Sequence, residues 1–420
     1  MAQPSMGSAQ RRVAITGMGF LTPAGGDLDT FWAACCSGRS ALRPFQNLDT
    51  TGLPVTVGGE VDNAFFAPQE MPDSLKTVDR ALLLAQAAAG RALRSAGFDT
   101  ASPDLQPIAL ALGTGAGPNE SAESCYGTFF LKGPKALRPR TVTRYMFNSI
   151  AAEISLAFHL TGAQFTVAAA CASANMAMAR AVDLIRLGRE TTVLTGGADM
   201  PLTTSCIAAW NAMRILATSP DPQRCCLPFH RQRTGFSLAE GAALFVFEEM
   251  EHAQRRGAAI LAEVAGCGEN CDAIHITRPD AARQADCIRL ALKDAGVQPD
   301  QVDYINAHGT GTDANDATET EAIKMALGSH AKRVLISSTK SVIGHAMGAS
   351  GALELVAVIA ALQRQTAPPT ANLDEADPAC DLDYVPLKPR PAPLRIVLSN
   401  SFAFGGANSV LVLRRFEENN

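Results

Sequence analysis

A single cysteine lies where one sequence pattern gives way to another, in "FTVAAACASANMAMARAVDLIRLG". Residues 165–169 alternate in the manner of a buried strand, and residues 172–187 predict an amphipathic helix that stops at Gly188. Cys171 is therefore expected at a strand-to-helix turn, where backbone N–H groups and the helix dipole favour a thiolate. The alternative is a small buried cysteine packed in a close crossover.

A histidine follows a strand pattern in "NAHGTGTDANDATETEA". Taken alone, His308 belongs to a glycine-rich loop before a helix, with Asp316 or Thr318 near the N-cap. A metal site built from His308, Asp313 and Asp316 is a second alternative, although their spacing matches no recognised metal motif.

A lysine and a second histidine stand five residues apart in "SSTKSVIGHAMGASGALE", before a helix of small residues. Separately, Lys340 would be a solvated lysine and His345 a helix-capping residue.

Together these four residues fit carbon–carbon bond formation on thioesters. Cys171 would accept an acyl group. Neutral His308 and His345 would donate hydrogen bonds to the thioester oxygen of a malonyl unit, stabilising the enolate as carbon dioxide leaves. The fixed positive charge of Lys340 would orient His308 and help to keep it neutral.

The elements that must position these residues alternate between β-like and helical patterns. With 420 residues, the chain is long enough for two domains or two fused halves. The rhythm predicts α/β layers with mainly parallel strands. The segments around Cys171 and His345 are both strand, polar turn and small-residue helix, an internal echo that would bring the two turns together if the halves are related. Helices are predicted at Val78–Ser95, Ser173–Leu187, Ala281–Ala295, Ala317–Leu327 and Ala349–Gln363.

Composition argues against several classes of protein. A net charge of −5 gives no large basic field, so nucleic-acid binding is not expected. The longest uncharged run, Ile154 to Ala179, contains several polar residues, so no membrane span is expected. The N-terminus lacks the apolar core of a signal peptide, and eleven cysteines without a CxxC motif indicate reduced thiols in a cytoplasm.

The order and spacing of four motifs add a family resemblance. "AAACASA", "HGTGT", "KSVIGHAMGASGALE" and "NSFAFGGAN" are similar to motifs of the β-ketoacyl-acyl-carrier-protein synthases, in their elongating type II form. These condensing enzymes belong to the thiolase-like superfamily. The resemblance runs from about Arg12 to Phe416.

The resemblance implies an α/β thiolase-like fold, with two related βαβ halves in five layers (α-β-α-β-α). Residues 11–266 would carry the nucleophile, and residues 267–416 would carry the two histidines and the lysine. It also assigns further residues: Glu354 as the supporting family glutamate; Phe404 as the gating aromatic, its N–H forming an oxyanion hole with that of Cys171; Thr310 and Thr312 for the pantetheine arm; Ala116 and Thr141 for the acyl pocket; and Lys76, Lys135 and Arg214 for docking of the carrier protein.

The reaction implied is a decarboxylative Claisen condensation. Cys171 takes an acyl chain from acyl carrier protein, malonyl carrier protein loses carbon dioxide, and the carbanion attacks the acyl-cysteine. The product is a 3-oxoacyl carrier protein two carbons longer. The resemblance implies no cofactor and no metal, with acyl carrier protein as partner and either a homodimer or a heterodimer with a related ketosynthase or chain-length-factor subunit.

Some positions depart from the family pattern. His230 and Thr234 stand where two aspartates are usual, Ile343 replaces a common threonine, and Ala403 replaces a common glycine. These departures leave open a fatty-acid enzyme or a specialised polyketide or aryl-polyene synthase. Three other readings also stay open: a thiolase or coenzyme A-using initiating synthase, a non-catalytic chain-length partner, and a nucleotide-binding module suggested by "GMGFLTPAGG", which lacks GxGxxG.

Overall fold

The computed structural model describes residues 10–70, 78–102, 104 and 106–417. The N-terminal half contains β1 (Val13–Leu21), α1 (Leu28–Cys36), β2 (Arg43–Pro44), β3 (Val57–Gly58), α2 (Arg80–Ser95), β4 (Ala109–Gly113), α3 (Asn119–Lys132), α4 (Thr141–Tyr145), α5 (Ser149–Ala157), β5 (Gln164–Val167), α6 (Ser173–Arg186), β6 (Thr192–Asp199), α7 (Thr204–Ala212), β7 (Gly241–Glu249) and α8 (Met250–Arg255). The C-terminal half contains β8 (Ala262–Cys271), α9 (Ala281–Asp294), β9 (Tyr304–Asn306), α10 (Asp313–Leu327), β10 (Leu335–Ser337), α11 (Lys340–Ile343), α12 (Ser350–Arg364), β11 (Thr366–Ala367), β12 (Arg390–Pro391), β13 (Ile396–Phe402) and β14 (Ala407–Arg414).

The two halves repeat one strand order. The large sheet runs β10-β9-β13-β14-β8-β1-β7-β6-β4-β5, so each half places its strands in the order third, second, fourth, fifth, first. The halves meet where β1 pairs antiparallel with β8, at Val13 opposite Val264. The expected boundary at residues 266/267 falls inside β8. The internal echo seen in the sequence therefore reflects a repeated fold.

The prediction of mainly parallel strands is wrong for the middle of the sheet. β4 pairs in parallel with β5 and β6, and β9 pairs in parallel with β10 and β13. The five pairings from β13 to β6 through β14, β8, β1 and β7 are antiparallel. The pairing direction could not be predicted, because the rhythm of alternating strands and helices indicates parallel pairing, whereas β13 and β14, which pair antiparallel, follow one another without a long crossover helix.

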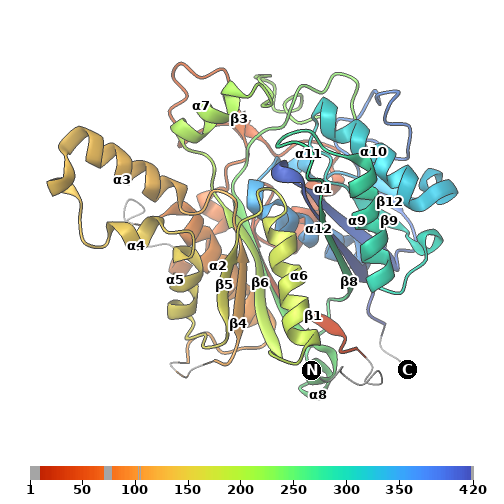
Figure 1. Ribbon diagram of the computed structural model, residues 1–420, viewed down its shortest axis with the longest axis horizontal. Coiled ribbons are helices and arrows are strands. Elements are labelled where there is room, and N and C mark those ends of the chain that lie inside the picture. The colour runs from red at the N-terminus through yellow and green to blue at the C-terminus, as the bar shows by residue number, and fades with distance from the viewer. Residues whose placement is uncertain (1–9, 71–77, 103, 105, 418–420) are drawn as a thin grey trace.

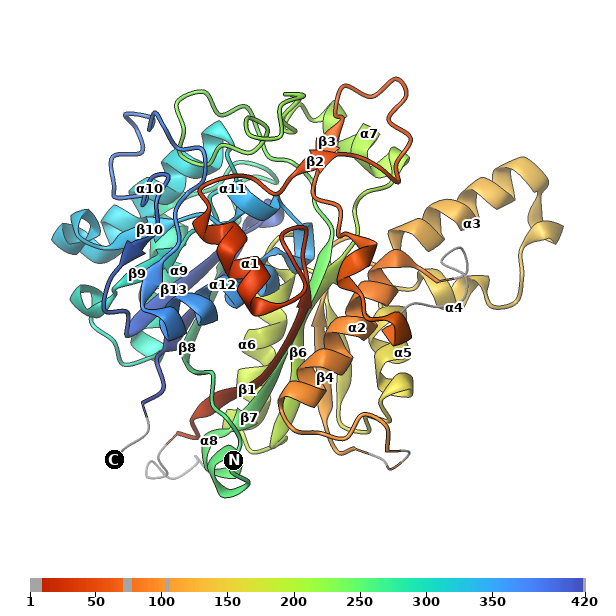
Figure 2. The ribbon, with the colours of Figure 1, turned by 180° about the vertical axis from the view of Figure 1, so that it is seen from behind.

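Helices form three layers around the two halves of the sheet, as Figures 1 and 2 show. α2 and α5 cover one half, and α9 and α10 cover the other. α6 and α12 pack against each other between them. Residues 350–362 of α12 are all buried, because this helix contacts protein on every side. The result is the expected α-β-α-β-α arrangement. Its central layer, α6 and α12, is rich in small side chains that allow close packing.

The predicted helices form, with small shifts at their ends. α6, α9 and α12 differ from the predicted bounds by one residue, and α2 begins two residues later than expected. α10 begins four residues earlier than expected, because Thr312, not Asp316 or Thr318, is its N-cap and accepts a hydrogen bond from the Asn315 N–H.

One segment stands away from this body. α3 and α4 form a hairpin that projects to the side in Figures 1 and 2. α3 has no buried residue, and the hairpin exposes large apolar side chains, among them Phe130 at 78% and Leu131 at 85%.

Among the described residues, one stretch of helix is long and apolar enough to cross a bilayer, Met347–Arg364. It is 89% buried inside the fold, so it forms the core here.

Candidate active site

Cys171 sits in a tight turn between β5 and α6. The turn depends on Ala170, which has a φ of +47°, a conformation that L-residues rarely adopt. Ser173 closes it, because its Oγ accepts from the Ala169 N–H at 2.9 Å and donates to the Ala170 carbonyl at 2.6 Å. Cys171 is thereby fixed before the first turn of α6 and is only 6% exposed.

Burial controls the state of this thiol. Desolvation raises the pKa of Cys171 to about 12, against the smaller lowering effects of Lys340 and of the Phe404 backbone N–H. Burial thus opposes the effect expected of the helix terminus and favours the thiol in the resting site. The thiol needs a base that removes its proton during the reaction.

His345 is placed to be that base. Its Nε2 lies 3.1 Å from Cys171 Sγ, and its Nδ1 lies 2.6 Å from the Oγ of Ser350. Backbone bonds to Ser237 and Ala239 anchor the residue. Burial and the charge of Lys340 lower the pKa of His345 well below its ordinary value, so the ring is neutral and can accept a proton.

His308 completes the group from the loop after β9. Its ring centre lies 5.6 Å from that of His345, with the two rings almost perpendicular. Lys340 Nζ lies 3.3 Å from His308 Nδ1 and donates to the His308 carbonyl at 2.7 Å. Because an ammonium group can only donate, Nδ1 accepts, and the proton of neutral His308 is on Nε2.

The electrostatics of this group keep His308 neutral. Burial, Lys340 and His345, in that order, lower the pKa of His308 well below its usual value. Glu354 forms a buried ion pair with Lys340, and burial raises the pKa of Glu354 to about 7. The pair fixes the ammonium group against His308.

A second carboxylate, missed in the sequence, holds the loop of His308. Glu319 on α10 accepts the backbone N–H groups of His308 and Gly309, each at 2.8 Å. Asn400 also donates to it at 3.1 Å. Its position eleven residues after His308, on the following helix, is the signal that could have identified it.

The side chains of Cys171, His308 and His345 face a cavity of about 260 Å³. Phe404 lies in its wall, with its ring stacked on Trp210 at 6.0 Å, and its backbone N–H is directed at Cys171. Thr310 and Thr312 also line the cavity and are joined by a 2.9 Å hydrogen bond between their hydroxyls. The structure therefore brings the predicted nucleophile, histidines, gate residue and threonines into one space.

Much of the rest of this wall was not predicted from sequence motifs. The additional lining residues come from the end of α7 and from the loop after β8: Trp210, Met213, Ile215, Asp272, His275, Ile276, Thr277 and Arg278. That loop is bonded to the loop of Phe404, since Gly405 N–H donates to the Ile276 carbonyl at 2.8 Å.

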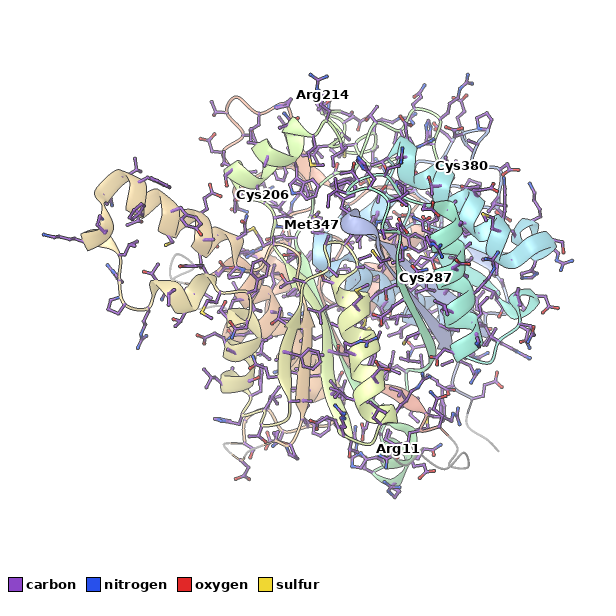
Figure 3. The ribbon with its side chains drawn as sticks, in the orientation of Figure 1. Arg11, Cys206, Arg214, Cys287, Met347 and Cys380 are labelled. Carbon is purple, nitrogen blue, oxygen red and sulfur yellow. The ribbon has the colours of Figure 1, made fainter. Side chains whose placement is uncertain are left out.

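The two residues expected in the acyl pocket lie apart from this cavity. The backbone N–H of Ala116 donates to the buried carboxylate of Asp199 at 3.0 Å, and Asp199 also accepts from the Gly348 N–H at 2.8 Å. Gly348 directly follows the buried Met347, which Figure 3 labels near the middle of the molecule. Thr141 lies on α4, in the projecting hairpin. Neither residue lines the cavity of Cys171 in the single chain.

The structure describes two of the three residues expected to dock the carrier protein, and these two lie on different segments. Lys76 lies outside the described residues. Lys135 is exposed in the projecting hairpin. Arg214 is exposed between the cavity-lining residues Met213 and Ile215, at the upper edge of Figure 3.

The residues that depart from the family pattern have structural partners. Among them, buried His230 lies 2.6 Å from Asp374. The nearby Arg233, which the chain shares with the family pattern, lies 2.5 Å from Asp377. The metal alternative gains no support, because the group of possible ligands found among the described residues is Cys171, His308 and His345, and the Asp313 side chain is 87% exposed.

Two family models match the chain. "Beta-ketoacyl synthase, N-terminal domain" matches residues 10–253, and "Beta-ketoacyl synthase, C-terminal domain" matches residues 261–374. Nodulation protein E of Rhizobium meliloti (strain 1021) is 43% identical, covering 96% of this chain and 99% of its own length. The 3-oxoacyl-[acyl-carrier-protein] synthase 2 of Coxiella burnetii is 37% identical, covering 97% and 99%.

Solved structures are similar over the same length. A type II polyketide ketosynthase, in complex with its acyl carrier protein and bound to the hexaketide, matches with a TM-score of 0.88 and 31% identity, covering 97% of this chain and 100% of that chain. The ishigamide ketosynthase/chain length factor matches with a TM-score of 0.89 and 36% identity, with the same coverage.

Proposed function

The chain belongs to the β-ketoacyl synthases, the condensing enzymes of fatty-acid and polyketide synthesis, and on this premise we propose the roles of its residues, its substrate class and its partners. The observation that carries the proposal is the contact of His345 Nε2 with Cys171 Sγ, beside a neutral His308 held by Lys340.

In the first half-reaction, Cys171 attacks the thioester of an acyl chain carried on pantetheine. Its proton passes to His345 Nε2 and then to the leaving pantetheine sulfur, so the acyl group and one proton exchange places. The N–H groups of Cys171 and Phe404 stabilise the oxyanion. Thr310 and Thr312 bind the arm.

In the second half-reaction, the malonyl thioester oxygen accepts hydrogen bonds from the Nε2–H groups of His308 and His345. The carbon–carbon bond to the carboxylate breaks, carbon dioxide leaves, and the electron pair forms the enolate. The enolate carbon attacks the acyl-cysteine, and the thiolate of Cys171 is released. Within this scheme no cofactor or metal takes part.

The retained nucleophile supports a catalytic subunit over a non-catalytic chain-length partner. Both histidines and Lys340 are also in place, an arrangement that suits decarboxylation of a malonyl unit rather than the chemistry of a thiolase. Incubating the purified chain with acyl and malonyl carrier proteins tests the proposal. A 3-oxoacyl product two carbons longer is expected, and its absence with every acyl chain would contradict it.

We propose that the partner subunit is a second copy of this chain. The hairpin of α3 and α4 exposes Phe130 and Leu131, and the edge strand β5 has no strand beyond it in the described part of the chain. Such an edge and apolar hairpin are covered when a like subunit packs against them. The alternative is a heterodimer with a related subunit. Mass spectrometry of the native complex would distinguish the two assemblies.

The small side chains of Ala116 and Thr141 support long or conjugated acyl chains as substrates. The possible fillers Phe129, Phe130 and Met146 are all more than 40% exposed in the single chain, so they do not fill its interior. Each extra buried methylene of substrate would add about 0.8 kcal/mol. Ala116→Phe should shorten the longest chain accepted while sparing short ones, and an unchanged chain-length profile would exclude Ala116 from the channel.

The carrier protein would approach the cavity mouth, where Arg214 lies among lining residues and Arg278 lines the wall. Acyl carrier proteins are acidic, so a local positive charge favours docking despite the net negative charge of the chain. All eleven cysteines are free, which is consistent with the proposed cytoplasmic location.

A further inference from the structure

One serine lies against the far side of the histidine that contacts the nucleophile. Ser350 is the first residue of α12 and is only 2% exposed. Its Oγ lies 2.6 Å from His345 Nδ1, while His345 Nε2 lies 3.1 Å from Cys171 Sγ. A single imidazole ring therefore connects a buried hydroxyl to the thiol.

The two half-reactions need opposite tautomers of this ring. To take the proton of Cys171, Nε2 must have a free lone pair, so the proton of the neutral ring must be on Nδ1. To donate to the malonyl thioester oxygen, Nε2 must carry the proton, so Nδ1 must be bare. A fixed donor or a fixed acceptor at Nδ1 would favour only one of these states.

A hydroxyl group can serve both. By rotation about its C–O bond, Ser350 can accept from Nδ1–H or donate to a bare Nδ1. We propose that Ser350 is a positioning residue that keeps both tautomers of His345 accessible, and so couples acyl transfer to decarboxylation at one site. This inference rests on the proposed function of His345.

The surroundings of the ring supply no other hydrogen-bond partner for Nδ1 among the described residues. Phe236 packs edge-on at a centroid distance of 4.9 Å, and His308 lies on the Nε2 side with Cys171. The charges nearby belong to the Lys340–Glu354 pair and to Asp199. Ser350 is thus the hydrogen-bond partner through which Nδ1 can either donate or accept.

Removal of the hydroxyl should therefore affect the half-reactions unequally. In Ser350→Ala, a proton on Nδ1 would be buried without an acceptor, whereas a proton on Nε2 still faces sulfur or substrate oxygen. The Nε2–H tautomer is then favoured. It can donate to the malonyl thioester but cannot accept the thiol proton, so acylation of Cys171 should slow while decarboxylation continues.

The experiment measures the two half-reactions separately. Acylation of Cys171 by acyl carrier protein is followed over time by intact-protein mass spectrometry, in the wild type, Ser350→Ala, Ser350→Thr and the control Ser399→Ala. Ser399 is a matched control because it is also fully buried, and its Oγ has no hydrogen-bond partner. Decarboxylation of malonyl carrier protein is measured by carbon dioxide release in Cys171→Ala, with and without Ser350→Ala.

Ser350→Ala should slow acylation about ten- to a hundredfold, the usual effect of leaving a buried donor unpaired. Decarboxylation should change by less than about threefold, and Ser350→Thr should recover most of the acylation rate because it retains a hydroxyl. Ser399→Ala should acylate like the wild type.

Normal acylation in Ser350→Ala would overturn the inference. So would an equal loss of both half-reactions, which would show that the serine only supports the structure. Neither result would affect the proposed function, which would fail instead if wild-type Cys171 were not acylated at all.

Discussion

The two halves of the molecule share a strand order but contribute different chemistry. The turn after the third strand holds Cys171 in the N-terminal half and the Lys340–His345 segment in the C-terminal half. The loop after the second strand leads to Ala116 and the projecting hairpin in one half, and to His308 in the other. One half thus presents the cysteine, and the other presents the two histidines and the lysine.

This difference shows how a repeated fold can divide a two-step reaction. Because the third-strand turns lead into α6 and α12, which pack against each other, a residue from each turn can come within hydrogen-bond distance, as Cys171 and His345 do. The residues of each turn could then change separately without altering the strands and helices that the two halves share. Cys171 and His308, one from each half, are therefore expected to be needed for different half-reactions.

The largest effect is expected at the nucleophile. Cys171→Ala should abolish condensation, because no side chain remains to hold the acyl group. Decarboxylation of malonyl carrier protein should persist, since His308, His345 and the backbone N–H groups are unchanged. Product mass and carbon dioxide release measure the two activities, and condensation in a cleanly purified variant would contradict the assignment.

His308→Ala tests the other half. Loss of one preorganised donor commonly lowers a rate by ~10²–10³, and we expect this loss in decarboxylation. Cys171 should still be acylated, because His345 and the oxyanion hole remain. A variant that decarboxylates at the wild-type rate would remove His308 from the mechanism.

A third prediction concerns the protonation of the resting Cys171 thiol, which should determine how the rate of its alkylation depends on pH. With a thiol pKa of about 12, the thiolate fraction rises as pH increases and stays small throughout the neutral range. Alkylation of Cys171 by iodoacetamide should therefore accelerate about tenfold per pH unit between about pH 7 and pH 10. Peptide mapping separates Cys171 from the other cysteines. A plateau near neutral pH would instead indicate a resting thiolate–imidazolium pair.

The smallest effect concerns docking of the carrier protein. Arg214→Glu at the cavity mouth should raise the apparent KM for carrier protein about three- to tenfold and make it less dependent on salt. The kcat should change little, because Arg214 lies outside the catalytic group. If the KM and its salt dependence both match the wild type, this arginine does not contact the carrier.

Sequence patterns indicated which residues would lie together, because these residues follow strands. Parallel strands of one half end at the same edge of the sheet, so His308 after β9 and Lys340 after β10 had to be close. The contact with Cys171 depended on recognising the repeat of the two halves.

Other features depend on packing that no local pattern encodes. The raised pKa of Cys171 arises from burial by elements far apart in the chain. Ser350 is one small residue in a helix of small residues, so its sequence context does not single it out. Its contact with His345 forms across a turn in which Met347 has a φ of +48°. The projecting hairpin offers no periodic core face, because α3 buries none of its residues in the single chain.

The central claim is that Cys171 carries the acyl chain, and the position of the covalent adduct tests it most directly. The chain is incubated with a panel of acyl carrier proteins, without a malonyl donor, and its peptides are analysed by mass spectrometry. The account predicts an acyl group on the peptide containing Cys171, and on no other of the eleven cysteines. An adduct on a different cysteine, or no adduct with any acyl chain, would contradict it.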